Sequence, residues 1–374
     1  MSKWRTVVGG AVLTLAASLL PGVAAGASAA PVTNTEAPSL TGTPRVGQTL
    51  SVDPGSWQPD GATFTYQWLR DGKPVSGRNA RTQVLTEGDL GRRVSVKVAA
   101  RRTGNEPGFA TTNAVSVTAG ALVPLSPATI SGTPRYRQKL TASPGRWATT
   151  GITFTYRWYR DGKPLYDSTA RTRTMSHTDV GHRFSVRAIA QKKAYVRNVG
   201  PRSATTSSVR HLHDARRTVT YSVVSDGATI PLRGFMDQVA ETYADARGWR
   251  KGAVAFRRVA TGGSFTVVLA RADRVPSYSS ACSSTYSCRV GRYVIINQDR
   301  WVGTTQAWRN AGQSLRNYRH MVVNHETGHW FGKGHPTCGG RGQLAPVMQQ
   351  QSKGLQGCRP NPWPLDSEAA GLRR

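Results

Sequence analysis

Acidic side chains are scarce in this chain of 374 residues. There are only 20 Asp and Glu against 50 Lys and Arg, and the formal net charge is +30. This shortage of carboxylates implies anionic surroundings or partners, such as nucleic acid, an acidic envelope polymer or acidic substrates. The basic residues are spread along the chain without a long run, which fits equally well with a generally arginine-rich surface. No base-stacking or groove-reading motif accompanies them, so nucleic-acid binding is not favoured.

Long apolar runs are missing after the first thirty residues, so no later segment is predicted to span a bilayer. The N-terminus begins with the short basic stretch MSKWR, continues with the apolar VVGGAVLTLAASLL, and reaches the small residues Ala27-Ser28-Ala29. This order is typical of a cleaved signal peptide. There is no twin arginine and no cysteine at the expected cut, which argues against a Tat signal and a lipid anchor. We therefore expect residues 1–29 to be a signal peptide and the chain to be secreted; an uncleaved anchor is the alternative.

Cysteine is also rare, and the four cysteines all lie in the C-terminal part: Cys282, Cys288, Cys338 and Cys358. An even number in an oxidising compartment predicts two disulfides. Three pairings are possible, and we favour the one that joins sequence neighbours, Cys282–Cys288 and Cys338–Cys358.

A repeat fills the first half of the chain. GSWQPDGATFTYQWLRDGKP at 55–74 matches GRWATTGITFTYRWYRDGKP at 145–164 without a gap. The offset is constant at 90 residues, both from Trp57 to Trp147 and from Trp68 to Trp158. Such self-similarity indicates two copies of one domain, at 30–120 and 121–210.

Each copy is predicted to be all-β. FTYQW and FTYRW alternate apolar and polar residues before the turn signal Asp-Gly-Lys-Pro, and VSVKV and FSVRA alternate in the same way. Short strands at this spacing are typical of a β-sandwich, and the repeats resemble Ig-like modules. Trp68 and Trp158 are expected in the two cores. We predict spacer or adhesive modules.

The second repeat is the more basic of the two. Residues 125–210 hold 16 Lys and Arg against 3 acids, whereas residues 38–120 hold 10 against 6. The second repeat is therefore the better candidate for binding an anionic cell-wall polymer, and a solvated basic face without a partner is the alternative. Its candidate residues are Arg135, Arg137, Lys139, Arg183, Lys192, Lys193 and Arg197.

The pattern changes at about His211. A strand is expected at 217–224, an amphipathic helix at 231–247, two more strands in SFTVVLA and RYVIINQ, and a long helix up to Phe331. Strands that alternate with helices over 211–374 predict an α/β domain. The fold class is therefore multidomain, with two all-β sandwich repeats before an α/β domain.

The long helix carries the chemistry-bearing residues. Leu315, Tyr318, Val322, His325 and His329 follow steps of three and four, so they form one stripe. Imidazoles at i and i+4 lie one above the other and can share a metal ion. Glu326 follows the first histidine and points about 100° round the helix, beside the metal, where a carboxylate acts as general base.

A third ligand requires the helix to end. If the helix continued, His335 would lie about 15 Å along the axis from His325, too far to share an ion. Gly332, supported by Gly334, is expected to break the helix and let His335 swing back. Three histidines leave the fourth tetrahedral position for water, which predicts one catalytic Zn²⁺. Closure of the site by Cys338 is the alternative.

The positions His325, Glu326, His329, Gly332 and His335 match HExxHxxGxxH, and this stretch resembles the zinc signature of the metzincin metallopeptidases. The resemblance implies a metzincin-like fold for 211–374, with Met348 in a supporting turn under the histidines. The layout is also similar to an uncharacterised group of secreted actinobacterial proteins. Two departures bear on specificity: Gln350 stands where some members have tyrosine, and the domain is short.

Three segments are predicted around the cleft. The Ser-rich loop between Cys282 and Cys288 is expected at its rim, and Trp363 in CRPNPWPLD near a side-chain pocket. YVIINQ at 293–298 is expected either to offer its backbone to an extended peptide or to be an ordinary interior strand.

These features predict a secreted zinc endopeptidase that acts on peptide or protein substrates. A cell-wall amide hydrolase and a non-catalytic envelope adhesion protein are the alternatives. The intact Glu326 argues against the adhesion protein, because a site that only binds needs no base there.

Overall fold

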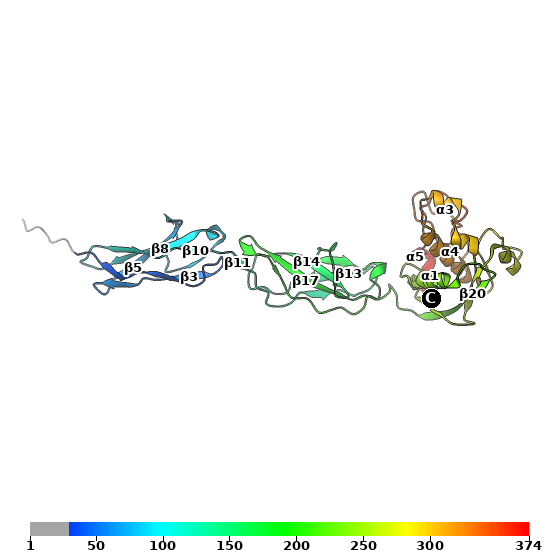
Figure 1. The fold of residues 1–374 in the computed structure, drawn as a ribbon, viewed down its shortest axis with the longest axis horizontal. Helices are drawn as coiled ribbons and strands as arrows, with labels where there is room; N and C mark the ends of the chain where they lie inside the picture. The colour runs from blue at the N-terminus through cyan, green and yellow to red at the C-terminus, as the bar shows by residue number, and fades with distance from the viewer. Residues whose placement is uncertain (1–29, 374) are drawn as a thin grey trace, which may run out of the picture. The chain divides into compact units, whose positions relative to one another are not determined.

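The computed structural model describes residues 30–373 (Figure 1). The predicted signal peptide at 1–29 lies outside these residues. The described residues fall into two compact units that divide between Ala121 and Leu122, except that Lys193–Tyr195 belongs with the first. Most of the regular structure is β-strand, and none of the helices in this described part is long and apolar enough to cross a membrane.

The two repeats are all-β, as the alternating patterns predict. In the first repeat, a three-stranded sheet holds β2 (Ser39–Thr41), β3 (Thr49–Asp53) and β7 (Thr82–Val84). A second sheet holds β10 (Val115–Ser116), β8 (Arg93–Arg101), β5 (Thr63–Arg70) and β6 (Lys73–Pro74), with β9 (Gly108–Thr111) on β8.

The second repeat has the same pattern. One sheet holds β12 (Thr129–Ser131), β13 (Lys139–Ser143) and β16 (Thr172–Thr174). The other holds β15 (Lys163–Leu165), β14 (Thr153–Arg160), β17 (Phe184–Gln191) and β19 (Asn198–Val199). The central antiparallel pair of each repeat has the same register, with Trp68 opposite Val96 and Trp158 opposite Val186.

Both tryptophans lie in the cores, as predicted. Trp68 and Trp158 are fully buried. Their indole N–H groups donate to the backbone oxygens of Ala80 at 2.8 Å and Ala170 at 2.9 Å. A buried indole needs such an acceptor, and each repeat supplies it twelve residues further along the chain.

A mixed sheet organises the region after residue 211. Its strand order is β21 (Val254–Arg258), β20 (Arg217–Asp226), β22 (Phe265–Ala270), β24 (Tyr293–Asn297) and β23 (Cys288–Val290). The first four strands run parallel, and only β23 is antiparallel. All six residues of β22 are buried because both faces of this central strand are covered.

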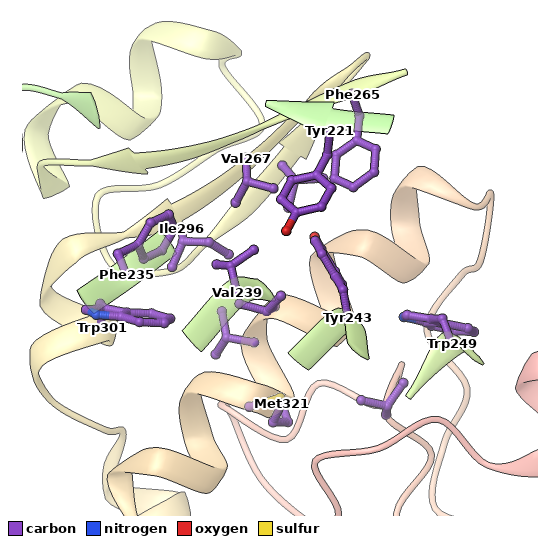
Figure 2. Packing of buried hydrophobic residues seen from close by; sticks show 14 of the residues in the cluster. Tyr221, Phe235, Val239, Tyr243, Trp249, Phe265, Val267, Ile296, Trp301 and Met321 are labelled. Atoms are coloured by element: carbon purple, nitrogen blue, oxygen red, sulfur yellow. The ribbon is translucent and has the colours of Figure 1, made fainter. Parts of the chain in front are cut away.

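Helices α1 (Leu232–Ala244) and α4 (Leu315–Trp330) pack on one face of this sheet and against each other. Figure 2 shows the apolar cluster between them and the strands, where Val239 and Tyr243 from α1 meet Tyr221, Val267 and the other sheet residues. Phe235, Val239 and Tyr243 are spaced by four residues and are all buried, as expected of the amphipathic helix predicted at 231–247. The opposite face is covered by η4 (Ala272–Tyr278) and the loop that follows it, with Val275 and Cys282 packed on Val268 and Ile295.

Candidate metal and catalytic site

The three histidines predicted as ligands come together at the end of α4. Their ligand atoms lie within 4.8 Å of one another. Nε2 of His325 lies 3.2 Å from Nε2 of His335 and 3.2 Å from Nε2 of His329. Tetrahedral zinc with bonds of about 2.0–2.1 Å places its nitrogen ligands about 3.3 Å apart, so these separations fit the ion.

The other ring nitrogens orient two of these imidazoles. Nδ1 of His325 lies 2.8 Å from the backbone oxygen of Val347, and Nδ1 of His329 lies 2.8 Å from that of Lys333. A carbonyl oxygen only accepts, so each Nδ1 carries the hydrogen and each Nε2 presents its lone pair. Such a partner fixes the tautomer and the ring orientation that a metal ligand needs.

Local sequence sets both ends of α4. Ser314 caps its start, where Oγ accepts a hydrogen bond from the N–H of Asn317 at 3.1 Å. Beyond the last turn, Gly332 adopts φ +77°, and the N–H of Lys333 donates to the oxygen of Gly328 at 3.0 Å. The predicted break is therefore present at Gly332, whereas Gly334 has no positive φ. The turn brings His335 back to the helix.

Met348, which the resemblance placed in a supporting turn, packs against α4 at Gly328. It is buried, and its sulfur contacts the helix at Gly328 so closely that a Cβ there would lie 2.1 Å from Sδ. This contact requires the helix position to be glycine. Met348 thereby holds the turn after residue 345 against α4.

A carboxylate that the sequence analysis missed supports this turn. Glu368, in α5 (Asp366–Ala370), accepts hydrogen bonds from the backbone N–H groups of Val347 at 3.0 Å and Met348 at 2.9 Å. A third N–H, that of Leu365, donates at 2.6 Å. Glu368 therefore anchors the residue whose carbonyl orients His325. The acidic residue in the first turn of a short helix was visible in the sequence, but two of its partners, Val347 and Met348, lie about 20 residues away.

Glu326 lies next to the ligands and is buried. Burial raises its pKa to about 8, while the nearby positive charge of Arg289 acts in the opposite direction. Arg289 is a second residue that the sequence analysis missed. It lies on β23, and its Nη2 donates to the backbone oxygen of His329 at 2.7 Å. Its role could not be read from the sequence because β23 is only three residues long.

These groups open into one cavity of about 360 Å³. The histidines and Glu326 line it together with Tyr318, Met321 and Val322, so the predicted stripe of α4 faces the cavity rather than only the core. The loop between Cys282 and Cys288 forms its rim, as predicted, with Ser283, Tyr286 and Ser287. On the far side of the ligands the wall continues through Gln350, Gln351, Ser352 and Lys353.

Both disulfides have the predicted pairing, Cys282–Cys288 and Cys338–Cys358. Cys338 is therefore not a fourth metal ligand, which removes that alternative for a closed structural site. The side chain of Asn297 ties the first disulfide loop to β24, since its Nδ2 donates to the oxygen of Ser284 at 2.7 Å.

The structure decides between the two alternatives for residues 293–298 and corrects the prediction for Trp363. Residues 293–298 do not offer a free edge, because β24 lies between β22 and β23, so the interior-strand alternative is confirmed. Trp363 does not line the cavity. It is buried against the ring of His320 at 4.8 Å and the guanidinium of Arg247 at 4.3 Å. The indole ring therefore packs against His320 of α4, away from the cavity.

Comparison with known proteins gives partial matches. Residues 210–362 match the model of a family described as "Protein of unknown function (DUF3152)". A stretch of 150 residues is 31% identical to the "Highly immunogenic outer capsid protein" of Enterobacteria phage T4, covering 37% of this chain and 38% of that protein. The chain thus spans well under half the length of this curated relative.

Two of the solved structures that match this chain are multidomain fragments of other proteins. Three N-terminal domains of the bacteriophage RB49 Hoc protein are 15% identical, with a TM-score of 0.24, over 52% of this chain and 65% of that one. Domains A168–A170 of titin are 15% identical, with a TM-score of 0.20, over 49% of this chain and 63% of that one. The Ig-like character of the repeats is supported here by their own structure, since each repeat consists of antiparallel strands in separate sheets.

The resemblance of residues 211–374 to the metzincins is wrong as a family assignment. The family model that matches this region is one of unknown function, and no metallopeptidase family matches. The physical reason is that five positions within eleven residues define how a helix and a turn present ligands, and they do not define the domain around them. What the comparison supports for residues 210–362 is similarity to the DUF3152 family model.

Proposed function

We propose that this protein is a zinc-dependent hydrolase of peptide bonds. One observation carries the proposal: three imidazole Nε2 atoms converge beside a buried carboxylate, and all four groups line the same cavity. Three histidines without a fourth protein ligand are typical of catalytic zinc rather than of structural zinc. When bound there, zinc polarises a carbonyl and lowers the pKa of water.

In this proposal His325, His329 and His335 hold the ion, and Val347 and Lys333 orient two of these rings through their backbone oxygens. Glu326 takes a proton from the attacking water at a carboxylate oxygen and returns it to the nitrogen of the departing amine. The apolar side chains of Met321 and Val322 line the same cavity and reduce the water around that carboxylate.

We further propose that the protein acts outside the cell. The support is the apolar N-terminus of signal-peptide type, together with two disulfides, which persist in oxidising compartments.

The test measures hydrolysis of a peptide library by the chain without residues 1–29, as purified, after chelation, and after zinc is restored. We expect activity to vanish on chelation and to return with zinc. Glu326→Gln should keep stoichiometric zinc and lose activity by roughly 10²–10⁴-fold. Glu241→Gln is the matched control, because Glu241 lies on the exposed side of α1, where it pairs with Arg316. Activity that survives both chelation and Glu326→Gln contradicts the proposal, as does a zinc-loaded protein that cleaves no peptide.

A further inference from the structure

The wall of the cavity is unequal in charge. The described residues that line it include two cations, Arg289 and Lys353, but only one carboxylate, that of Glu326. The other polar side chains are neutral hydroxyls and amides, from Ser283, Tyr286, Ser287, Tyr318, Gln350, Gln351 and Ser352. A divalent ion on the histidines adds further positive charge. A concave site of one sign concentrates ligands of the opposite sign.

Arg289 lies on the side of the site formed by His329 and Glu326. Its hydrogen bond to the oxygen of His329 uses one of the five N–H donors of the guanidinium. Within residues 30–373 no carboxylate forms an ion pair with it. Donors of this cation therefore remain for a ligand that enters the cavity.

Like His335, Lys353 lines the cavity. Its side chain is exposed, and its ammonium lies 5.6 Å from the ring centre of Tyr286 on the disulfide loop. In the described chain Lys353, like Arg289, has no acidic partner. An exposed lysine held at an active-site rim without a partner is suited to meet a substrate anion.

We propose that the cavity selects substrates that carry a carboxylate near the scissile amide, held by Lys353 and Arg289. The inference rests on the proposed peptide hydrolysis and narrows its substrate class to acidic peptides. Guanidinium and ammonium groups form charge-assisted hydrogen bonds with a carboxylate, which are stronger than those with a neutral amide. A basic substrate side chain in the same place meets two like charges and is disfavoured.

The experiment uses acetylated, amidated hexapeptides that differ at a single position, which carries Glu, Gln or Lys. Hydrolysis is measured with the zinc-loaded protein, and binding by calorimetry with the zinc-loaded Glu326→Gln variant. At the favoured position we expect the Glu peptide to be hydrolysed faster and bound more tightly than the Gln peptide, by about tenfold or more in each measurement. The Lys peptide should be hydrolysed more slowly and bound more weakly than the Gln peptide. Binding that does not distinguish Glu from Gln at any position overturns the inference.

Variants separate the rim charge from net charge. In Lys353→Gln, the ratio of the Glu peptide to the Gln peptide, in both hydrolysis and binding, should fall close to one. In Lys353→Glu, the Lys peptide should become the preferred substrate. Arg233→Gln removes an equal charge from an exposed site on α1, outside the cavity, and should leave the ratio unchanged. An unaltered ratio in both Lys353 variants contradicts the inference.

Failure of the two proposals can be told apart. Zinc-dependent cleavage without preference for Glu overturns the acidic-substrate inference alone. Selective binding of Glu peptides without cleavage overturns the peptidase proposal and supports the charge selectivity of the cavity.

Discussion

The imidazole of His325 donates from Nδ1 to the backbone oxygen of Val347, 22 residues further along the chain, at 2.8 Å. The N–H of that same residue donates to Glu368 at 3.0 Å. A metal ligand is thus connected through the backbone of one residue to a carboxylate on the last α-helix of the described chain. Partners of this kind tune a metal site through the orientation of the ligand.

Glu368→Gln should therefore weaken zinc binding, although it changes none of the three histidine ligands. The amide loses the charge that satisfies three backbone N–H groups, so the turn at Val347 and Met348 loosens. We expect the zinc affinity to fall by roughly 10–100-fold, as measured by competition with a chromophoric chelator. Asp237→Asn, a change of one carboxylate in α1 at a position outside the cavity, serves as control and should bind zinc as the unaltered chain does. Equal affinities of the Glu368→Gln variant and the unaltered chain would show that the turn does not need this anchor.

His335→Ala tests the third ligand. Two histidines and water bind zinc much more weakly than three, and we expect stoichiometric zinc in the unaltered chain and little or none in the variant after dialysis. The measurement is metal content by mass spectrometry. His213→Ala, a histidine outside the cluster, should keep its zinc. Full zinc occupancy in His335→Ala would mean that another group completes the site.

Gly328→Ala should destabilise the protein, although alanine is usually the better helix former. A Cβ at this position would lie 2.1 Å from Sδ of Met348 and 2.9 Å from the ring of Trp249. We expect the free energy of unfolding to fall by about 1–3 kcal/mol, as is usual for an overpacked core, in urea titration.

Gly234→Ala is the matched control for that change. Gly234 also lies inside a helix, α1, but a Cβ there meets nothing within 4 Å. The same substitution should raise the free energy of unfolding by about 0.5–1 kcal/mol. If both substitutions raise the free energy of unfolding, or both lower it, the proposed role of the Gly328–Met348 contact is contradicted.

His320 should make stability depend on pH. Burial lowers its pKa to about 4 from its ordinary 6.5, and Nδ1 is 2.8 Å from Oγ1 of Thr242. Between these values the unfolded chain binds a proton that the folded chain excludes, so stability falls as the pH falls from 6.5 to about 4. The contribution of this group amounts to about 3 kcal/mol over that window.

The measurement compares urea unfolding of the metal-free protein and of the metal-free His320→Gln variant at several pH values. The free energy of unfolding should depend less steeply on pH in the variant, because the contribution of His320 is lost while the other histidines act equally in both proteins. If the two plots of unfolding free energy against pH are parallel, the pH dependence comes from groups other than His320.

Local sequence predicted the parts of this protein that depend on periodicity and spacing. The 90-residue repeat led to two sandwiches with the same register, because alternating residues must bury one face wherever they occur. Likewise, His325 and His329 share one side of α4 because four residues make about one helical turn. The pairing of the four cysteines, favoured for its short loops, is the one present.

Contacts between distant segments were not visible in the sequence. Strand β23 is too short to show alternation, so Arg289 could not be anticipated, and the sequence could not decide whether β24 is an edge strand or an interior strand. Trp363 was misplaced because an apolar ring next to prolines packs equally well in a cleft wall or against His320, and only the packing of α4 decides between them.

The sequence by itself thus determined the repeats, the helix with two histidines and a glutamate, and the glycine that ends this helix, since each depends on residues within a few turns of one another. The tertiary structure alone decided how far His335 returns, which carbonyl orients His325, that Glu368 anchors this carbonyl, and that two cations face the cavity. These depend on the packing of segments that are from ten to more than sixty residues apart along the chain, such as those of Arg289 and Lys353, and no local pattern encodes such packing.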